Sequence, residues 1–129
     1  MTNKKKKIAF VIGALTPGGA ERVISTLSNG LVKDFDVAII TFKKSNPFYR
    51  LDERVKVISC FEQINKPTSI FGSIKLNYTI FKKVSSVVKN EQIDLLIGFI
   101  TSANIIATLA ALKNDIPSLI SERNDPLKK

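Results

Sequence analysis

Histidine is absent from this 129-residue sequence, and cysteine occurs only once, as Cys60. Without an imidazole, this chain alone cannot form a Ser-His-Asp triad, a Cys-His pair or a His-ligated metal site. A single cysteine cannot form an internal disulfide, so a reducing cytoplasm is the expected environment. Carboxylates with the spacing of metal ligands are also missing, and we expect Asp52-Glu53 to face solvent. We therefore predict neither a metal nor a cofactor.

Acidic residues are outnumbered, 11 against 20 lysines and arginines, which gives a net charge of +9. This excess favours an anionic partner, such as a phosphorylated substrate, an acidic lipid surface or a nucleic acid, although charge also simply keeps proteins soluble. No apolar run approaches the ~18 residues of a membrane span, and the run after Lys4–Lys7 is too short for a secretory signal. The composition is that of one soluble globular domain over residues 1–129.

The most informative stretch is Gly13–Arg22, which follows the apolar run Ile8–Ile12 and leads into an amphipathic segment. Strand, glycine-rich turn and helix in this order are typical of the first unit of a doubly wound α/β domain. Gly18 and Gly19 lack a β-carbon, so we expect the backbone there to take positive φ and to approach another molecule closely. The first N–H groups of a helix beginning near Ala20 would then face the crevice above the strand and receive an anion.

Two phosphate-loop patterns do not fit this stretch. Gly13 and Gly18 have the P-loop spacing, but Gly19 and Ala20 stand where Lys and Ser/Thr are required, which excludes a nucleotide hydrolase. The dinucleotide fingerprint fails because Leu15 replaces its second glycine. What remains is a Gly-Gly turn at a helix N-terminus, a pattern equally typical of a turn with no ligand.

Apolar and amphipathic segments alternate along the rest of the chain. Strands are expected at Lys7–Ile12, Asp36–Phe42, Arg54–Ser59, Asp94–Phe99 and Ser118–Ser121, and helices at Ala20–Val32, Ile70–Asn90 and Ala103–Lys113. This pattern predicts an α/β fold: a Rossmann-like, doubly wound parallel sheet in the order 3-2-1-4-5, with helices on both faces. Ligands bind such folds at the carboxyl ends of the strands, where the Gly-Gly loop, Thr101–Asn104 and Glu122–Asp125 are expected.

The predicted helix Ile70–Asn90 has two distinct sides. An apolar arc is expected to pack in the core; it consists of Ile70, Ile74, Tyr78, Phe81, Val84 and Val88. Lys75, Lys82 and Lys89 are seven residues apart and follow one flank over roughly 21 Å, at ~1.5 Å per residue. Such a flank is typical of an ordinary solvated edge. The alternative is a contact with a lipid diphosphate or an anionic membrane surface.

Two motifs carry a resemblance to a known family. With Pro17–Val23 after the first strand and Ser121–Pro126 after the last, the chain is similar to the N-terminal half of a retaining glycosyltransferase of family 4, which has the GT-B fold. It most resembles bacterial enzymes that extend polyprenyl-diphosphate-linked oligosaccharides or surface polysaccharides. In those relatives the helix corresponding to Ile70–Asn90 carries basic residues for the lipid diphosphate.

The resemblance implies roles for individual residues. Those implied to bind substrate or phosphate are Gly18, Gly19, Ala20, Arg22 and Asn124. Glu122 and Arg123 would be the catalytic residues on the acceptor side of the cleft, with Arg123 contacting the transferred sugar. Many family members have His at this position; arginine stays protonated, so Arg123 is not expected to act as a general base.

The resemblance also implies what this chain lacks. Family members have a second Rossmann-like domain with an E-x7-E motif that binds the nucleotide-sugar, and no such motif occurs here. We therefore expect a truncated, acceptor-side domain, inactive alone, of a transferase that uses a nucleotide-sugar and a sugar or polyprenyl-diphosphate acceptor. Its expected location is the cytoplasm, peripheral at the inner face of the cytoplasmic membrane.

Two other functions stay open at this point. A non-catalytic Rossmann-like module that docks on an anionic membrane or a protein partner is motivated by the +9 charge. Binding to nucleic acid has only the charge in its favour: basic strands interleaved with aromatics and recognition-helix patterns are missing, so we do not expect a nucleic-acid partner.

Overall fold

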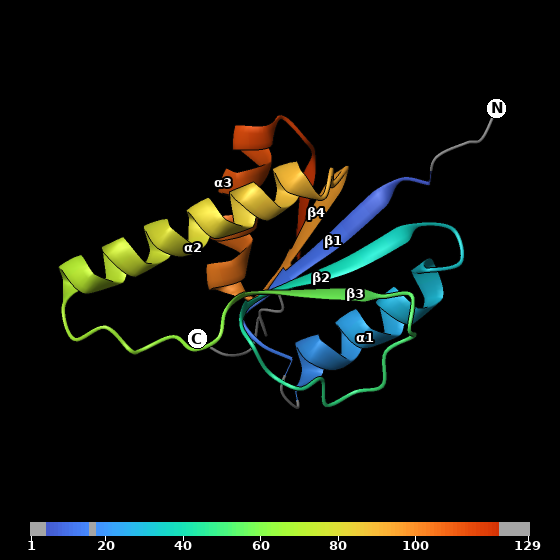
Figure 1. Cartoon of the computed structure of the whole chain (residues 1–129), viewed down its shortest axis with the longest axis horizontal. Helices are drawn as coiled ribbons and strands as arrows, with labels where there is room; N and C mark the ends of the chain where they lie inside the picture. Colours follow the sequence, from blue (N-terminus) through green and yellow to red (C-terminus); the bar gives the residue numbers. More distant parts are fainter. Residues whose placement is uncertain (1–4, 16–17, 122–129) are drawn as a thin grey trace, which may run out of the picture.

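The apolar runs form one parallel sheet in the order β3-β2-β1-β4-β5. The structure is a computed structural model, and it describes residues 5–15 and 18–121, apart from the side chain of Thr101. The strands are β1 (Lys7–Ile12), β2 (Asp36–Lys43), β3 (Lys56–Phe61), β4 (Leu95–Phe99) and β5 (Ser118–Ser121). β1 is central and pairs with β2 on one side and β4 on the other (Figure 1). The predicted fold class and strand order are confirmed.

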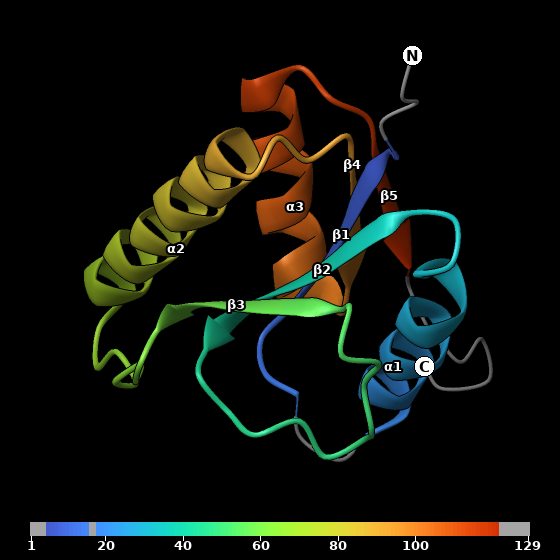
Figure 2. The ribbon, with the colours of Figure 1, turned by 45° about the vertical axis from the view of Figure 1, so that its right-hand side comes forward.

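Three helices cover the two faces of this sheet: α1 (Gly19–Leu31), α2 (Ile70–Asn90) and α3 (Thr101–Asn114). α2 and α3 lie on one face and α1 on the other (Figure 2). Successive side chains of a strand point to opposite faces. Accordingly, Ala9 and Val11 of β1 pack in the cluster under α2 and α3, whereas Phe10 and Ile12 pack in the cluster under α1.

Most element boundaries agree with the sequence prediction. β1, α2 and β5 have the expected bounds, and α3 begins earlier than expected, at Thr101. β3 begins at Lys56 and not at Arg54, because residues 52–55 form a turn. In this turn the Val55 N–H donates to the Asp52 carbonyl (3.0 Å), and the Arg54 N–H donates to the Asp52 carboxylate (2.9 Å).

Residues 44–55 connect β2 to β3 without a helix. This segment returns beside α1 from the carboxyl edge of the sheet to the amino edge. At its start the Phe48 N–H donates to the Leu15 carbonyl (3.1 Å). Farther on, the Asn29 amide of α1 donates to the Arg50 carbonyl (2.9 Å) and accepts from the Asp52 N–H (2.7 Å). These bonds hold the connection against α1.

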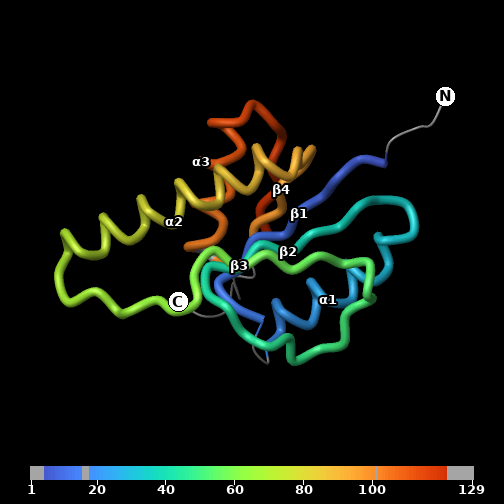
Figure 3. Tube along the Cα trace, viewed as in Figure 1, coloured from blue at the N-terminus to red at the C-terminus, as the bar shows by residue number. Residues whose placement is uncertain are grey.

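α2 is longer than the part of the sheet that it covers. Its first turns extend beyond the carboxyl ends of the strands, whereas its C-terminal half lies over the sheet (Figures 1 and 3). The prediction of one continuous core face is therefore wrong for Ile70, Ile74 and Tyr78, which are 78%, 61% and 59% exposed. Val84 and Val88, farther along the same arc, are buried as predicted.

Candidate functional site

A hollow of about 580 Å³ lies at the carboxyl edge of the sheet, where β1 and β2 end. Its lining residues come from the segment after β1, from the end of β2, from the loop before α2 and from α2 itself: Gly13, Ala14, Phe42, Lys43, Ile64, Lys66, Pro67 and Leu76. Doubly wound folds bind their ligands at this edge. The hollow is therefore the candidate functional site.

Backbone hydrogen bonds fix the wall of the hollow beside β1. The Gly13 carbonyl accepts from the N–H groups of Phe42 (3.0 Å) and Lys43 (3.2 Å). Two residues later, the Leu15 N–H donates to the Ser45 hydroxyl (3.0 Å). The segment after β1 is thus bonded to the end of β2 and to Ser45 just beyond it, so this wall is preformed.

The lining of the hollow combines apolar side chains with two cations. Phe42 and Leu76 supply apolar surface, and the ammonium groups of Lys43 and Lys66 belong to exposed residues. Ligand sites commonly have such a mostly apolar lining with a few charged groups. The sequence prediction missed both lysines. Lys43 had a usable signal, because it directly follows the predicted strand Asp36–Phe42 and carboxyl ends of strands bind ligands.

Gly18 and Gly19 differ from the expectation in their conformation. Gly18 precedes α1 in an extended conformation (φ 174°, ψ 170°), and Gly19 is the first residue of the helix. No glycine in the described part of the chain has a positive φ, so the prediction of positive φ at these two positions is wrong.

The missing β-carbon at Gly18 makes room for the carboxylate of Glu21. A β-carbon at Gly18 would lie only 2.5 Å from Glu21 Oε1. A carboxylate at a helix N-terminus is favoured by the helix dipole. The anion beside the start of α1 is therefore the chain's own, and a ligand phosphate bound there would adjoin or displace Glu21.

Ala20 and Arg22, the other two residues at the start of α1 that were predicted to bind substrate or phosphate, differ in their exposure to solvent. Ala20 is half-buried and packs against the cluster under α1. Arg22 is exposed, and its backbone N–H donates to the Gly18 carbonyl (3.0 Å) in the first turn. The same carbonyl accepts from the hydroxyl of Tyr49 (3.2 Å). Arg22 can thus reach a ligand with its side chain, whereas Ala20 offers only its backbone.

The second motif begins where the described residues end. Glu122, Arg123 and Asn124 lie outside them, so their predicted roles stay predictions. The preceding residue, Ser121, ends β5, and its carbonyl accepts from the Asn104 amide of α3 (3.3 Å). Asn104 is buried, so a buried side chain holds the carboxyl end of β5.

Ile100, between β4 and α3, has an unusual backbone. Its φ of 76° and ψ of 144° are rare for a β-branched residue. Such strained positions cost of order 1–3 kcal/mol and cluster at functional sites. Ile100 lies at the carboxyl edge and is half-exposed, and sequence analysis missed it because nothing in the sequence marks a non-glycine residue for positive φ.

Lys75, Lys82 and Lys89 are all exposed on α2. None of them forms an ion pair with another residue of the described part of the chain. The ammonium group of Lys82 lies 5.7 Å from the centroid of the Tyr78 ring. The structure therefore leaves these three charges available to an external anion.

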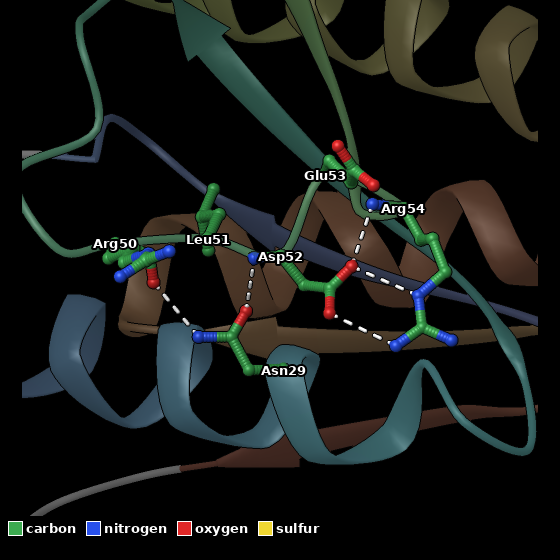
Figure 4. Close-up of a pocket in the computed structure, with 6 residues that line it drawn as sticks. All are labelled: Asn29, Arg50, Leu51, Asp52, Glu53 and Arg54. Atoms are coloured by element: carbon green, nitrogen blue, oxygen red, sulfur yellow. Dashed lines mark hydrogen bonds and ion pairs between the residues drawn. The ribbon is translucent and has the colours of Figure 1, made fainter.

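A larger hollow, of about 720 Å³, lies at the other end of α1, before β3 (Figure 4). Several of the polar groups that line it bond to one another. Asn29 is bonded to Arg50 and Asp52, and the Arg54 guanidinium donates to both carboxylate oxygens of Asp52 (3.0 and 3.1 Å). This hollow lies away from the carboxyl edge, and its bonds fix the loop before β3, so we assign it a structural role.

Two further features bear on the chemistry of the site. Within residues 5–15 and 18–121, no three His, Cys, Asp or Glu side chains are grouped to hold a metal ion. No helix in the same part of the chain combines the length and apolarity needed to cross a bilayer.

Comparison with protein families gives one match that covers most of the chain. The model of glycosyltransferase family 4 matches residues 17–126. A similar curated protein is a Campylobacter jejuni enzyme named GalNAc-α-(1→4)-GalNAc-α-(1→3)-diNAcBac-PP-undecaprenol α-1,4-N-acetyl-D-galactosaminyltransferase. It is 35% identical over 119 residues, which are 92% of this chain and 33% of that protein.

Another similar protein is an uncharacterised glycosyltransferase of Haemophilus influenzae, 32% identical over 91% of this chain and 32% of its own length. The chain thus spans about a third of the length of these relatives.

Solved structures share the fold at lower sequence identity. The apo form of the lipopolysaccharide outer core galactosyltransferase WaaB matches with a TM-score of 0.62 and 20% identity, over 88% of this chain and 32% of that one. The C-terminal domain of the PF1911 hydrogenase from Pyrococcus furiosus matches equally well, with a TM-score of 0.62, 18% identity and 95% of both chains covered. Because both matches are so distant in sequence, they show the fold alone.

Proposed function

Because the chain belongs to glycosyltransferase family 4, we propose that it is the N-terminal, acceptor-binding part of an enzyme that transfers a sugar from a nucleotide-sugar to a lipid-linked or polysaccharide acceptor. The observation that carries this proposal is the 35% identity, over 92% of the chain, to an enzyme named for an undecaprenol-diphosphate-linked acceptor. The hollow at the carboxyl edge agrees with this role, since it offers preformed backbone, apolar surface and two lysines.

In this proposal the hollow binds the end of the acceptor. Phe42 and Leu76 pack against the sugar, and Lys43 and Lys66 attract its anionic groups. At the start of α1, Gly18, Gly19, Ala20 and Arg22 serve the donor's diphosphate or the acceptor. In the sequence after β5, Glu122, Arg123 and Asn124 have the role of lining the acceptor side of the cleft. The second domain of the enzyme binds the nucleotide-sugar. Arg22 adds a positive charge near the departing diphosphate, and Arg123 contacts the transferred sugar.

The proposal also places the enzyme at the cytoplasmic face of a membrane. The overhanging turns of α2 expose Ile70, Phe71 and Ile74. Lys75, Lys82 and Lys89 follow on the same helix without an ion-pair partner among the described residues. Apolar side chains beside lysines are the combination with which surface helices bind anionic lipids. The same surface would serve a non-catalytic docking module, the alternative function.

The test of transferase activity uses the full-length protein, a panel of nucleotide-sugars and a diphosphate-linked saccharide acceptor. We expect sugar transfer, and we expect the double variant Lys43→Ala/Lys66→Ala to raise KM for the acceptor about tenfold. Lys33→Ala, which removes an exposed lysine after the end of α1, is the control and should leave KM unchanged. Absence of transfer with every donor would contradict the proposal and favour the docking module.

Membrane binding is tested by sedimentation with liposomes of phosphatidylglycerol or phosphatidylcholine. The triple variant Lys75→Ala/Lys82→Ala/Lys89→Ala should lose most binding to the anionic vesicles. The control Lys5→Ala/Lys6→Ala/Lys33→Ala removes the same charge from exposed positions away from α2, and it should retain binding. If both triple variants lose binding equally, net charge and not the flank of α2 is responsible.

A further inference from the structure

The junction between β4 and α3 combines three features that each lower stability. Ile100 has a φ of 76°, which is strained for a β-branched residue. Gly98 stands inside β4, where glycine weakens a strand. Asn104 is only 4% exposed, and its Oδ1 accepts no hydrogen bond from the described residues. Local rules that are broken together in this way mark a functional site, and this junction lies at the carboxyl edge of the sheet.

These features bring the side chain of Asn104 against the sheet. Because Gly98 has no side chain, Asn104 packs directly on β4, with Oδ1 only 2.7 Å from the place that a β-carbon of Gly98 would take. The turn at Ile100 starts α3, and the Ile100 carbonyl accepts from the Asn104 N–H (2.8 Å). The glycine and the turn thus fix Asn104 beside the ends of β4 and β5.

Asn104 bonds to β5 where the neighbouring strand no longer can. The pairing of β4 with β5 ends at Phe99 and Ser121, because the chain turns away at Ile100. The Ser121 carbonyl accepts instead from Asn104 Nδ2 (3.3 Å). The opposite orientation of the amide would bring two acceptors together, so the donor must face Ser121. The side chain therefore takes the place of a strand as the hydrogen-bond partner of the last residue of β5.

Stability alone does not explain an asparagine at this position. An apolar side chain would pack between β4 and α3 without leaving a buried acceptor unpaired. What asparagine adds is a donor to Ser121, the residue that directly precedes Glu122 and Arg123 in the sequence. Consecutive Cα atoms are about 3.8 Å apart, so fixing Ser121 also limits where the following residues can lie.

We propose that Asn104 is a positioning residue of the transferase, whose hydrogen bond to Ser121 fixes the start of the motif that contains Glu122 and Arg123. The inference rests on the proposed function for the roles of these two residues. Reacting groups must be held within about 0.5 Å of the productive geometry, and hydrogen bonds from neighbouring side chains hold them there. Asn104 is buried, so it acts through Ser121 and does not itself contact the substrate.

The test compares two asparagines of α3 in the full-length protein. Asn104→Ala removes the donor to Ser121. The control is Asn114→Ala, at the other end of α3, which removes an amide that donates to the Ser85 carbonyl (3.3 Å), the Ser85 hydroxyl (3.0 Å) and the Ala110 carbonyl (2.9 Å). Asn114 makes more bonds than Asn104 does, so a loss of activity that reflects destabilisation alone should be at least as large in the control.

Steady-state kinetics of sugar transfer give the first measurement. Asn104→Ala should lower kcat about tenfold and change KM for the acceptor less than about twofold, because misplaced reacting groups weaken the transition state more than binding. Asn114→Ala should retain the kcat of the wild type. Asn104→Asp, which keeps the shape of the side chain but sets an acceptor against the Ser121 carbonyl, is the second variant and should also lower kcat. Unchanged kcat in both Asn104 variants, or equal losses in Asn104→Ala and Asn114→Ala, would overturn the proposal.

Hydrogen exchange measured by mass spectrometry separates this inference from the proposed function, because it needs no substrate. The peptide that contains Ser121 should exchange its backbone amides several-fold faster in Asn104→Ala than in the wild type, and at the wild-type rate in Asn114→Ala. If this difference is found but the wild type transfers no sugar from any donor, Asn104 still holds the motif and the transferase proposal fails. If exchange is the same in all three proteins although sugar is transferred, the positioning role is wrong.

Discussion

Gly98 of β4 and Asn104 of α3 are packed so closely that no side chain fits between them. A β-carbon at Gly98 would lie 2.7 Å from Asn104 Oδ1, 2.9 Å from Asn104 Cα and 3.2 Å from the Ala103 carbonyl oxygen. Asn104 in turn donates to the carbonyl of Ser121 at the end of β5. The close approach at Gly98 therefore sets the position of α3 and, through Asn104, holds the carboxyl end of β5.

We predict that Gly98→Ala destabilises the protein by roughly 1–3 kcal/mol, because α3 must move away from β4 to admit the methyl group. The control is Gly30→Ala in α1, where a β-carbon meets no atom within 4 Å; this variant should be neutral or stabilising by up to about 1 kcal/mol, since alanine favours the helix. Urea denaturation of both variants measures the difference. Equal stability of the two variants would contradict the close packing.

The two halves of α2 should respond differently to truncation. Val84 is fully buried, so Val84→Ala should cost about 2 kcal/mol for the lost methyl groups and the cavity that remains. Ile74 projects beyond the sheet, so Ile74→Ala should change stability by less than about 0.5 kcal/mol and should instead weaken liposome binding. Thermal denaturation and vesicle sedimentation measure the two effects. A large loss of stability in Ile74→Ala would mean that the overhang packs against the domain.

The amino-acid sequence predicted the order of the helices and strands well, because capping residues, prolines and the periodicity of apolar residues are all local signals. The start of α2 is an example: Ser69 caps the helix by accepting a hydrogen bond from the Gly72 N–H (3.0 Å), and the loop before it contains Pro67. The apolar arc of α2 also has the expected periodicity. What the periodicity could not tell is how far the sheet extends beneath the helix, and this is why Ile70 and Ile74 were assigned to the core.

Of the candidate site, only the edge of the sheet on which it lies could be predicted from the sequence, and none of the residues predicted to bind substrate lines the hollow. The rule that ligands bind at carboxyl ends of strands located the edge, and Lys43 follows from that rule. Lys66 lines the hollow from the loop before α2. Its place there depends on how this loop packs against the sheet, so the sequence alone did not predict it. The position of the Glu21 carboxylate beside Gly18 could not be predicted from the sequence either. A pair of glycines predicts that there is space beside the backbone, but it does not specify which group occupies that space.

The ion pair before β3 should be visible in the titration of Asp52. The Arg54 guanidinium, and next the Arg54 backbone N–H, donate to this carboxylate and lower the pKa of Asp52 from its ordinary 3.8 to about 2. Arg54→Gln should raise the pKa part of the way back, because the backbone donor remains. Arg50→Gln, in the same hollow, should leave the pKa of Asp52 unchanged. Carbon-13 NMR of the carboxyl group measures all three proteins.

The same shift has a consequence for acid stability. The folded-state pKa of Asp52 lies below the unfolded value, so the ionised carboxylate stabilises the fold above about pH 4 and this contribution is lost as the pH falls toward 2. The Arg54→Gln variant should therefore show a weaker dependence of stability on pH in this window. An unchanged dependence would mean that the pair contributes nothing to the acid transition, as many exposed ion pairs do.

Cys60 should be chemically inert in the folded protein. Burial raises the pKa of its thiol from the ordinary 9.0 to about 11, against a smaller opposite effect of the nearby Lys83 ammonium group. Since the thiolate is the reactive form, only about one molecule in a thousand is reactive at pH 8. Iodoacetamide should alkylate the native protein far more slowly than the urea-unfolded protein, with a rate that rises about tenfold per pH unit up to pH 11.

The direction of this shift also predicts how stability changes at alkaline pH. The folded state retains the Cys60 proton between pH 9 and about 11, whereas the unfolded state has lost it, so ionisation of the thiol lowers the stability as the pH rises through this window. Cys60→Ala should reduce that dependence, because it removes the titrating group. Rapid alkylation of the native protein at pH 8, with the fold intact by circular dichroism, would show that the thiol is solvated and would contradict its packing against the core beneath α2 and α3.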